Sequence, residues 1–316
     1  MLKRVKKLIS LGVMTVLGFS VVGCSSSNQE NSDGAKITLV LSTGGVNDES
    51  FNQSAWEGAL KAKEEYGVEV SYIESASETD YIQNIETAID NDSDVVVGVG
   101  FQVGGKVMEV AKSYPEQKFM VIDKENEENL ENVTSITFSE EQAGYLAGLV
   151  AAKMTKTNVL GWIGGLDIPS CSNFYLGFEK GAKEVNKDIK VLKQFTNSFT
   201  DAAKGKIIAQ QMINSKADII LTASGTGNVG ALEAIKENNK FAIGVDLPSN
   251  HLEPNHVVTS ALKNIGQGLK LSIKDYVDGN FKGGQIRYDL TTGGVGFEKT
   301  DLIPQDVIEF VESKMK

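Results

Sequence analysis

The chain has 316 residues, with 31 Lys and Arg against 42 Asp and Glu, so its formal net charge at pH 7 is −11. An acidic surface repels phosphate backbones and anionic lipids, which argues against nucleic-acid binding and against charge-driven adsorption to a membrane. The two histidines and two cysteines show no spacing typical of a metal site, and we expect neither a metal nor a cofactor.

The N-terminal residues have the pattern of a lipoprotein signal. Four basic residues and no acid precede an apolar run over residues 8–22, an order typical of a secretory signal peptide. The run is shorter than the roughly 20 residues that a transmembrane helix needs, and it ends in the lipobox-like sequence Val21-Val22-Gly23-Cys24. We predict a signal peptide over residues 1–23 and a diacylglycerol on Cys24. The alternative is an ordinary signal peptide with an incidental cysteine.

The residues after the signal indicate a tethered domain. Residues 24–35 are polar and rich in Ser and Asn, as in a flexible linker, so the predicted location is the extracytoplasmic face of the cell membrane, contacted only through the lipid. Cleavage before Cys24 removes the four basic residues and changes the net charge from −11 to −15. Cys171 then remains alone, so no intrachain disulfide can form.

Short apolar runs alternate with longer amphipathic runs from residue 36 onward, which is typical of parallel strands joined by crossover helices. Predicted strands cover residues 37–41, 69–74, 95–99, 118–122, 133–138, 158–163, 190–195, 218–222, 241–245, 257–261 and 285–290. Predicted helices cover residues 51–66, 81–91, 103–114, 174–186, 200–214, 229–236, 265–278 and 304–314.

One further helix is predicted to run from a Ser139–Gln142 capping box through Lys153. Because this helix is strongly apolar, we expect it inside the junction of two lobes. The alternation of strands and helices restarts after this helix. It predicts an α/β fold of two doubly wound parallel-sheet lobes, joined by a hinge that the chain crosses several times. The predicted N-terminal lobe comprises residues 36–139 and 262–290, and the C-terminal lobe residues 140–261 and 291–316.

Ligands in open parallel sheets bind beyond the carboxyl ends of the strands. The loop after the first strand contains Asn47, Asp48, Phe51 and Asn52, which combine polar groups with an aromatic ring at a helix start. The alternative is that Asn47 and Asp48 cap the helix and that Phe51 belongs to the core.

Three charged residues occupy further strand ends: Asp123, Asp246 and Lys263. Such residues at equivalent positions predict a converging polar lining. Phe174 is expected in the loop after the strand at 158–163, opposite Phe51, so that the two rings sandwich a planar ligand. Phe174 could instead be a core residue, with Tyr175 or Phe178 as the stacking ring.

A literal GxGxxG runs from Gly225 through Thr226 and Gly227 to Gly230, after a strand and before a helix. With Asp246 as a ribose-binding acid it favours an NAD-dependent dehydrogenase. The motif, however, comes late in the chain, and dinucleotides are scarce outside the cytoplasm. No Ser/His/Asp arrangement or nucleophile elbow is visible either, so we predict a binding protein and not an enzyme.

The chain resembles the basic membrane protein family of lipoproteins, whose purine-nucleoside-binding members serve ABC transporters. The likeness extends from about Ile37 to Val311. It is carried by NDESFNQSAWEG at 47–58, EQAGYLAG at 141–148, Phe174 with Gly177 and Phe178, Asp246, Lys263 and GGVG at 293–296.

The resemblance implies a type I periplasmic-binding-protein fold that closes on one purine nucleoside. In similar proteins, rings at the positions of Phe51 and Phe174 sandwich the base, while Asp246 and Lys263 with the loop at 225–227 hold the ribose. Asn47, Asp48 and Asp123 would read polar edges of the nucleoside. Residues 168–173 depart from the basic residues expected there, which leaves the charge of the cleft rim and local partner contacts in question.

We therefore expect a monomeric extracytoplasmic lipoprotein that binds adenosine, guanosine or inosine and delivers it to an ABC permease with a cytoplasmic ATPase. A sugar or autoinducer-type receptor of the same fold is the main alternative. An extracellular dehydrogenase and a surface protein that contacts host molecules are two others.

Overall fold

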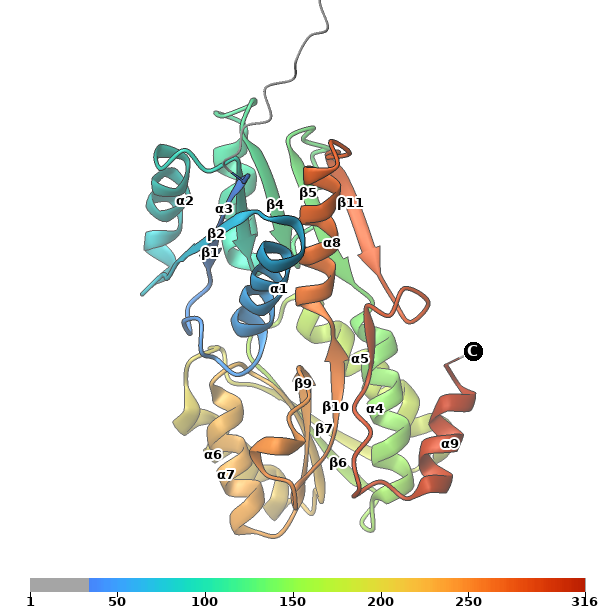
Figure 1. Cartoon of the computed structure of the whole chain (residues 1–316). Helices are drawn as coiled ribbons and strands as arrows, with labels where there is room; N and C mark the ends of the chain where they lie inside the picture. Colours follow the sequence, from blue (N-terminus) through green and yellow to red (C-terminus); the bar gives the residue numbers. More distant parts are fainter. Residues whose placement is uncertain (1–33, 316) are drawn as a thin grey trace, which may run out of the picture. The chain divides into compact units, whose positions relative to one another are not determined.

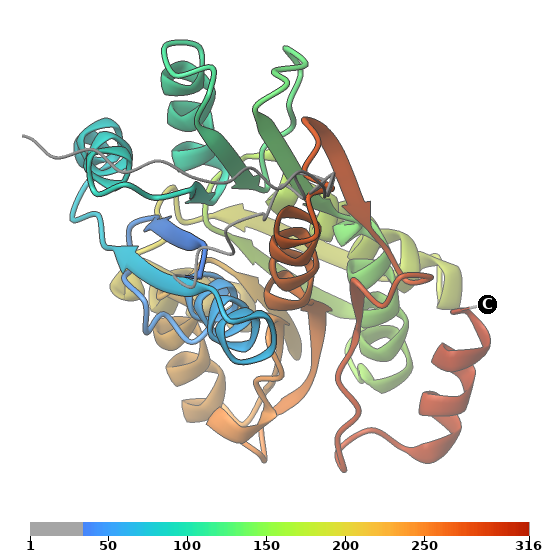
Figure 2. The same cartoon turned by 45° about the horizontal axis from the view of Figure 1, so that its top comes forward.

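The computed structural model of the chain describes residues 34–315. The predicted signal peptide, Cys24 and most of the predicted tether lie outside the described residues. Within the described part, the strands form two sheets of six strands each, with helices packed on both faces of each sheet (Figure 1; Figure 2). No helix among residues 34–315 is both long enough and apolar enough to cross a membrane.

The N-terminal sheet is parallel throughout. Its strands, in spatial order, are β11 (Gly284–Tyr288), β5 (Val133–Phe138), β4 (Lys118–Ile122), β3 (Val95–Val99), β1 (Lys36–Leu41) and β2 (Glu69–Ile73). The C-terminal sheet is parallel except for its first strand, β12, which runs antiparallel to β10. Its order is β12 (Val295–Phe297), β10 (Val257–Lys263), β9 (Phe241–Asp246), β8 (Ile219–Ala223), β6 (Val159–Gly164) and β7 (Lys190–Phe195).

The helices divide between the two sheets. The N-terminal lobe contains α1 (Phe51–Tyr66), α2 (Tyr81–Asp90), α3 (Phe101–Ala111) and α8 (Ile265–Val277). The C-terminal lobe contains α4 (Glu140–Met154), α5 (Pro169–Val185), α6 (Ala202–Asn214), α7 (Gly227–Glu237) and α9 (Gln305–Ser313). Two short 3-10 turns, η1 (Glu78–Asp80) and η2 (Asn250–Leu252), complete the described elements.

Burial on both faces explains the apolar strand sequences. In β1, Ile37 and Leu39 belong to the core cluster shared with α1 and α8, whereas Val40 belongs to the cluster of α2 and α3. Because successive side chains of a strand point to opposite faces, a strand covered on both sides must be apolar at nearly every position. Polar and charged groups at these strands are therefore concentrated where the strands end.

The described chain passes between the lobes three times, from β5 to α4, from β10 to α8 and from β11 to β12. The passages are hydrogen-bonded to one another. The Ser139 N–H donates to the Tyr288 carbonyl oxygen at 2.9 Å, and the Asn264 N–H donates to the Gly294 carbonyl oxygen at 2.9 Å. The two lobes of parallel strands and the repeated crossings between them agree with the predicted fold class.

Two predictions about α4 are wrong. Ser139 is its N-cap residue but makes no side-chain capping bond. Its Oγ instead accepts from Arg287 Nε at 3.1 Å, and the Gln142 side-chain oxygen accepts from the Leu290 N–H at 2.9 Å. The main packing partners of α4 are α5, α9, β10 and β12, so the helix lies in the C-terminal lobe, and its first turn reaches the junction.

The predicted position of Phe174 also needs correction. Because α5 begins at Pro169, Phe174 is a helical residue and does not belong to a loop. Proline is favoured in the first helical turn, where its missing N–H costs nothing. Residues 169–173 are therefore helical, and the Phe174 side chain comes from the second turn of α5.

Candidate functional site

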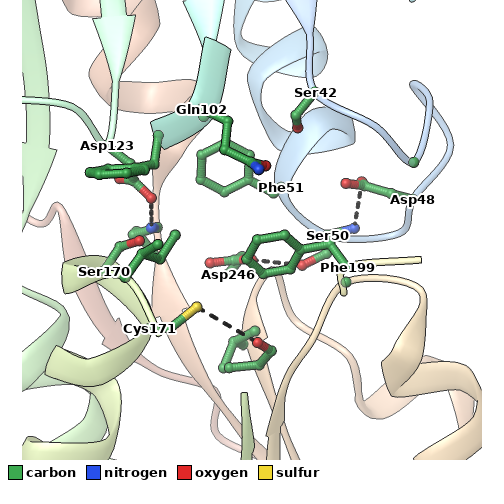
Figure 3. A pocket seen from close by; sticks show the side chains of 18 of the residues that line it. Ser42, Asp48, Ser50, Phe51, Gln102, Asp123, Ser170, Cys171, Phe199 and Asp246 are labelled. Atoms are coloured by element: carbon green, nitrogen blue, oxygen red, sulfur yellow. Dashed lines mark hydrogen bonds and ion pairs between the residues drawn. The ribbon is translucent and has the colours of Figure 1, made fainter. Parts of the chain in front are cut away.

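A cavity lies between the carboxyl ends of the two sheets (Figure 3). The empty space among its lining residues is about 770 Å³, a figure that includes space open to solvent. The N-terminal lobe contributes Ser42, Thr43, Gly44, Asp48, Ser50, Phe51, Gly100, Phe101, Gln102 and Asp123. The C-terminal lobe contributes Ile168, Ser170, Cys171, Phe174, Phe199, Ala223, Gly225, Thr226, Val245, Asp246 and Lys263.

Most of the residues singled out from the sequence line this cavity. They are Asp48, Phe51, Asp123, Phe174, Gly225, Thr226, Asp246 and Lys263. Three others do not. Asn47 is exposed at a loop, Asn52 is buried within the N-terminal lobe, and Gly227 begins α7.

Lys263, the last residue of β10, is the centre of the charged cluster. Its Nζ donates to Asp123 Oδ2 at 2.6 Å and to Glu140 Oε1 at 3.4 Å. Burial alone would lower the pKa of Lys263, but the nearby carboxylates of Asp123, Glu140 and Asp246 outweigh it and raise that pKa above its ordinary value. Lys263 is therefore fully charged in the folded protein.

Asp123 bridges the two lobes. It follows β4 of the N-terminal lobe, and its bond to Lys263 reaches the end of β10 in the C-terminal lobe. The other carboxylate oxygen, Oδ1, is buried and has no hydrogen-bond partner in the described structure. A buried acceptor without a partner is costly, so this oxygen is poised to accept a donor that enters the cavity.

Asp246 makes another side-chain hydrogen bond between the lobes. Ser50 Oγ, at the start of α1, donates to Asp246 Oδ2 at 2.6 Å. Burial raises the pKa of Asp246 to about 6, although Lys263 and the Ser50 hydroxyl oppose the rise. Asp246 and Asp123 both have positive φ, 65° and 63° respectively. Such backbone strain at non-glycine residues is typical of functional sites.

The loop before α1 is held by Asp48. Its carboxylate accepts from the backbone N–H groups of Ser50, Asn52 and Gln53 at 2.9 to 3.1 Å. Burial raises the pKa of Asp48, and these backbone bonds oppose the rise. Asp48 therefore performs the helix-capping role considered from the sequence and also lines the cavity.

Asn52 stabilises the same loop from within the lobe. Its side-chain nitrogen donates to the carbonyl oxygens of Ser42 and Gly45, at 3.2 and 3.1 Å, and its oxygen accepts from Ser42 Oγ at 2.9 Å. With its amide group fully engaged, Asn52 shapes the cavity wall without reaching it.

Aromatic rings contribute to the cavity wall from both lobes. Phe51 is the first residue of α1 and Phe174 lies in α5, and the Lys263 ammonium is 5.0 and 5.7 Å from their respective ring centroids. Phe174 is only 3% exposed, so its ring belongs to the core as well as to the wall. Tyr175 and Phe178 are not among the lining residues.

The glycine motif after β8 has a packing role. A Cβ on Gly230 would lie 1.8 Å from the Ala202 carbonyl oxygen, and one on Gly205 would lie 2.1 Å from that of Gly227. These contacts require glycine so that α6 and α7 can pack closely. Gly225, with φ of 59°, turns the chain at the cavity wall.

Sequence reasoning missed Phe199, which lies between β7 and α6 and contributes another ring (Figure 3). A Cβ on Gly165 would lie 2.2 Å from this ring, so the glycine leaves room for it. Phe101 and Gln102, which follow β3, were missed as well. The strand-end rule that located Asp123 would have located all three.

Cys171 is a further lining residue that the sequence did not single out. Its Sγ lies 3.9 Å from the Ala223 carbonyl oxygen, and burial raises the pKa of the thiol to about 12. Cys171 is therefore an uncharged thiol that adds apolar surface to the wall.

Residues 35–315 match the family model described as ABC transporter substrate-binding protein PnrA-like. The chain belongs to this family. The resemblance predicted from the sequence is thereby confirmed, and so is the prediction of a binding protein and not an enzyme.

Two relatives illustrate the family. Basic membrane protein A of Borreliella afzelii is 35% identical over 299 residues, covering 92% of this chain and 91% of that protein. The ABC transporter nucleoside-binding protein BmpA of Lactococcus lactis subsp. cremoris is 35% identical over 318 residues, covering 92% and 90%.

The fold of this PnrA-like protein is similar to that of solved solute-binding proteins. The crystal structure of one from an ABC transporter system of Aeropyrum pernix K1 superposes with a TM-score of 0.79 and 29% identity, covering 89% of this chain and 85% of that chain. The chain is thus the substrate-binding component of an ABC transporter, and its ligand is a small molecule.

Proposed function

We propose that the protein captures purine nucleosides, namely adenosine, guanosine or inosine, in the cavity between its lobes. One observation carries the proposal. Phe51 and Phe174 approach the same buried ammonium from opposite lobes, so flat apolar faces and charged groups line one space. A nucleoside offers the complementary pair of surfaces, an aromatic base and a polar sugar.

Stacking provides the first part of the proposed recognition. A base–aromatic stack contributes about 1–3 kcal/mol and tolerates different bases, which suits a site for several purines. Phe199 offers another ring on the C-terminal side of the cavity. It is therefore a candidate partner beside Phe51 and Phe174.

Polar contacts provide the second part. Carboxylates accept strongly from hydroxyl groups, so Asp246 and Lys263, with the backbone at Gly225 and Thr226, are proposed to hold the ribose. Asp48 and the unpartnered Oδ1 of Asp123 are proposed to accept from other N–H or O–H groups of the nucleoside. Asn47, Asn52 and Gly227 would act only through the shape of the adjoining loops, because they do not line the cavity.

Delivery completes the proposed function. We propose that Cys24 carries the lipid that holds a monomer at the extracytoplasmic face. The proposed lobes comprise residues 36–139 with 262–290 and residues 140–261 with 291–316, except that β10 carries residues 262 and 263 into the C-terminal sheet. The loaded protein would pass its nucleoside to a permease driven by a cytoplasmic ATPase. The printed name of the Lactococcus lactis relative, a nucleoside-binding protein of an ABC transporter, supports this assignment.

Calorimetric titration tests the ligand class. The full-length protein, purified in detergent, is titrated with adenosine, guanosine, inosine, cytidine, ribose and glucose. We expect purine nucleosides to bind at micromolar concentrations or below. Binding of a sugar without binding of any nucleoside would overturn the proposal in favour of the sugar-receptor alternative.

A further inference from the structure

Lys263 has a second acidic partner that does not line the cavity. An ammonium has three N–H donors. One is directed to Asp123, at 2.6 Å, and another to Glu140, at 3.4 Å. Asp123 and Lys263 are lining residues, whereas Glu140 is not. Glu140 can therefore influence a ligand only through the groups that it holds.

The burial of Glu140 calls for a reason. Its side chain is 4% exposed, and a carboxylate out of water costs several kcal/mol unless it is well paired. Besides Lys263, the groups that affect its ionisation are Asp123, at the end of β4, and Asn173, on α5. The next residue, Glu141, shows the usual alternative, since it is 49% exposed and pairs with Lys180 on the surface.

Glu140 and Asp123 differ in the lobe from which they reach Lys263. Glu140 begins α4, which packs against β10, so it belongs to the same lobe as Lys263. Asp123 follows β4 of the other lobe. When the lobes separate, the bond to Asp123 must break, while the bond to Glu140 can persist.

We infer that Glu140 is a positioning residue that keeps the Lys263 ammonium directed at the ribose subsite, before and after the lobes close. This inference rests on the proposed function, because the ribose is the part of the ligand assigned to Lys263. Burial raises the pKa of Glu140 to about 7, and the neighbouring Lys263 ammonium opposes this rise.

The test compares ligands that differ only in the groups facing Lys263. Adenosine and 2′,3′-dideoxyadenosine are titrated against the full-length wild type, Glu140→Gln and the matched control Glu141→Gln. We expect Glu140→Gln to weaken adenosine binding by about tenfold, in line with loss of a charged hydrogen bond, and to change dideoxyadenosine binding less than about twofold. Glu141→Gln should leave both affinities unchanged.

Thermal unfolding checks that the variants are folded, and Glu140→Asp serves if Glu140→Gln is not. Glu140→Asp keeps the negative charge on a shorter side chain. We therefore expect a smaller loss of affinity, again confined to adenosine. Equal weakening of both ligands would assign Glu140 a merely structural role, and unchanged adenosine affinity would overturn the inference directly. If the wild type binds no nucleoside, the proposed function itself fails, and the inference fails with it.

Discussion

Among the described residues that line the cavity, Lys263 alone is cationic, and it faces the carboxylates of Asp123 and Asp246. The cavity thus contains more carboxylates than ammonium groups, and this excess favours protonation of its carboxylates. The pKa of Asp246 is raised from 3.8 to about 6 by burial. Asp246 is therefore one residue that links the stability of the fold to pH.

Stability should fall as the pH rises through the folded-state pKa of Asp246. Because that pKa exceeds the unfolded value, the folded state binds the proton more tightly. The resulting stabilisation is at most about 3 kcal/mol. It is complete below pH 4 and is lost as the pH rises through 6. Melting temperatures of ligand-free wild type and Asp246→Asn from pH 5 to 8 test this. The variant should show the shallower pH dependence, and parallel curves would contradict the assignment.

The two phenylalanine rings allow a separate test. Phe51→Leu and Phe174→Leu keep apolar volume but remove the flat ring, so each should weaken purine nucleoside binding roughly 5- to 100-fold. Calorimetric titration measures the loss. Tyr175→Leu is the control, because Tyr175, the residue after Phe174 in α5, packs against Trp162 of β6 and does not line the cavity. If Phe51→Leu and Phe174→Leu both bound purine nucleosides with wild-type affinity, the stacking assignment would be wrong.

At the level of elements, the close pairing of α4 and α5 places the charged and aromatic parts of the site. Glu140 begins α4 and Phe174 lies in α5. Glycines let the two helices touch: a Cβ on Gly144 would lie 2.3 Å from the Phe174 carbonyl oxygen, and one on Gly181 would lie 2.1 Å from that of Tyr145. This backbone contact between α4 and α5 thus fixes the position of Phe174 along the α4 axis.

Gly181→Ala should therefore destabilise the protein by about 2 kcal/mol or more, since the added methyl group meets backbone atoms that cannot move independently. Gly105→Ala, on α3, is the matched control. Its Cβ would have no atom within 4 Å, so the better helix propensity of alanine should raise stability by about 0.5–1 kcal/mol. Denaturant unfolding compares the two. Equal effects would show that the α4–α5 contact tolerates extra volume.

The order of elements and much of the site followed from the sequence, because buried parallel strands are mainly apolar and the charged residues follow at their ends. That rule located Asp123, Asp246 and Lys263. Phe174 also lines the cavity as predicted, but from α5 and not from a loop, since a proline at 169 lets the helix start earlier than the apolar periodicity suggested.

Other parts of the site depend on contacts that no local pattern records. Glu140 lies 123 positions from Lys263 in the sequence, and only the packing of α4 on β10 brings the two together. Asn52 looks like a ligand-binding amide in the sequence, but its partners are backbone carbonyl groups of its own loop. Proximity along the chain could not distinguish these roles.

For the molecule as a whole, the arrangement of charge decides which ligands are excluded. The carboxylates of Asp48, Asp123 and Asp246 share the cavity with one ammonium, and the chain carries a net charge of −11. A phosphate group would meet repulsion both on approach and inside the site.

Adenosine should therefore stabilise the protein and adenosine 5′-monophosphate should not. At one hundred times its dissociation constant, a ligand adds about 2.7 kcal/mol to the free energy of unfolding. Thermal-shift measurements with matched concentrations of the two compounds, at low and high salt, test the difference. A monophosphate that stabilised as strongly as the nucleoside would show that the acidic lining does not control selection.

The late position of β11 has a consequence for biosynthesis. This strand covers β5, yet Lys282 beside it is 148 positions beyond Thr134 of β5. Until the ribosome has added β11, β5, which is buried at every position in the folded protein, presents an unpaired edge. Unpaired strand edges promote aggregation. The N-terminal sheet, whose first strands are synthesised early, is therefore completed only when β11 has been made. A nascent chain interrupted before residue 284 would have an unpaired edge at β5.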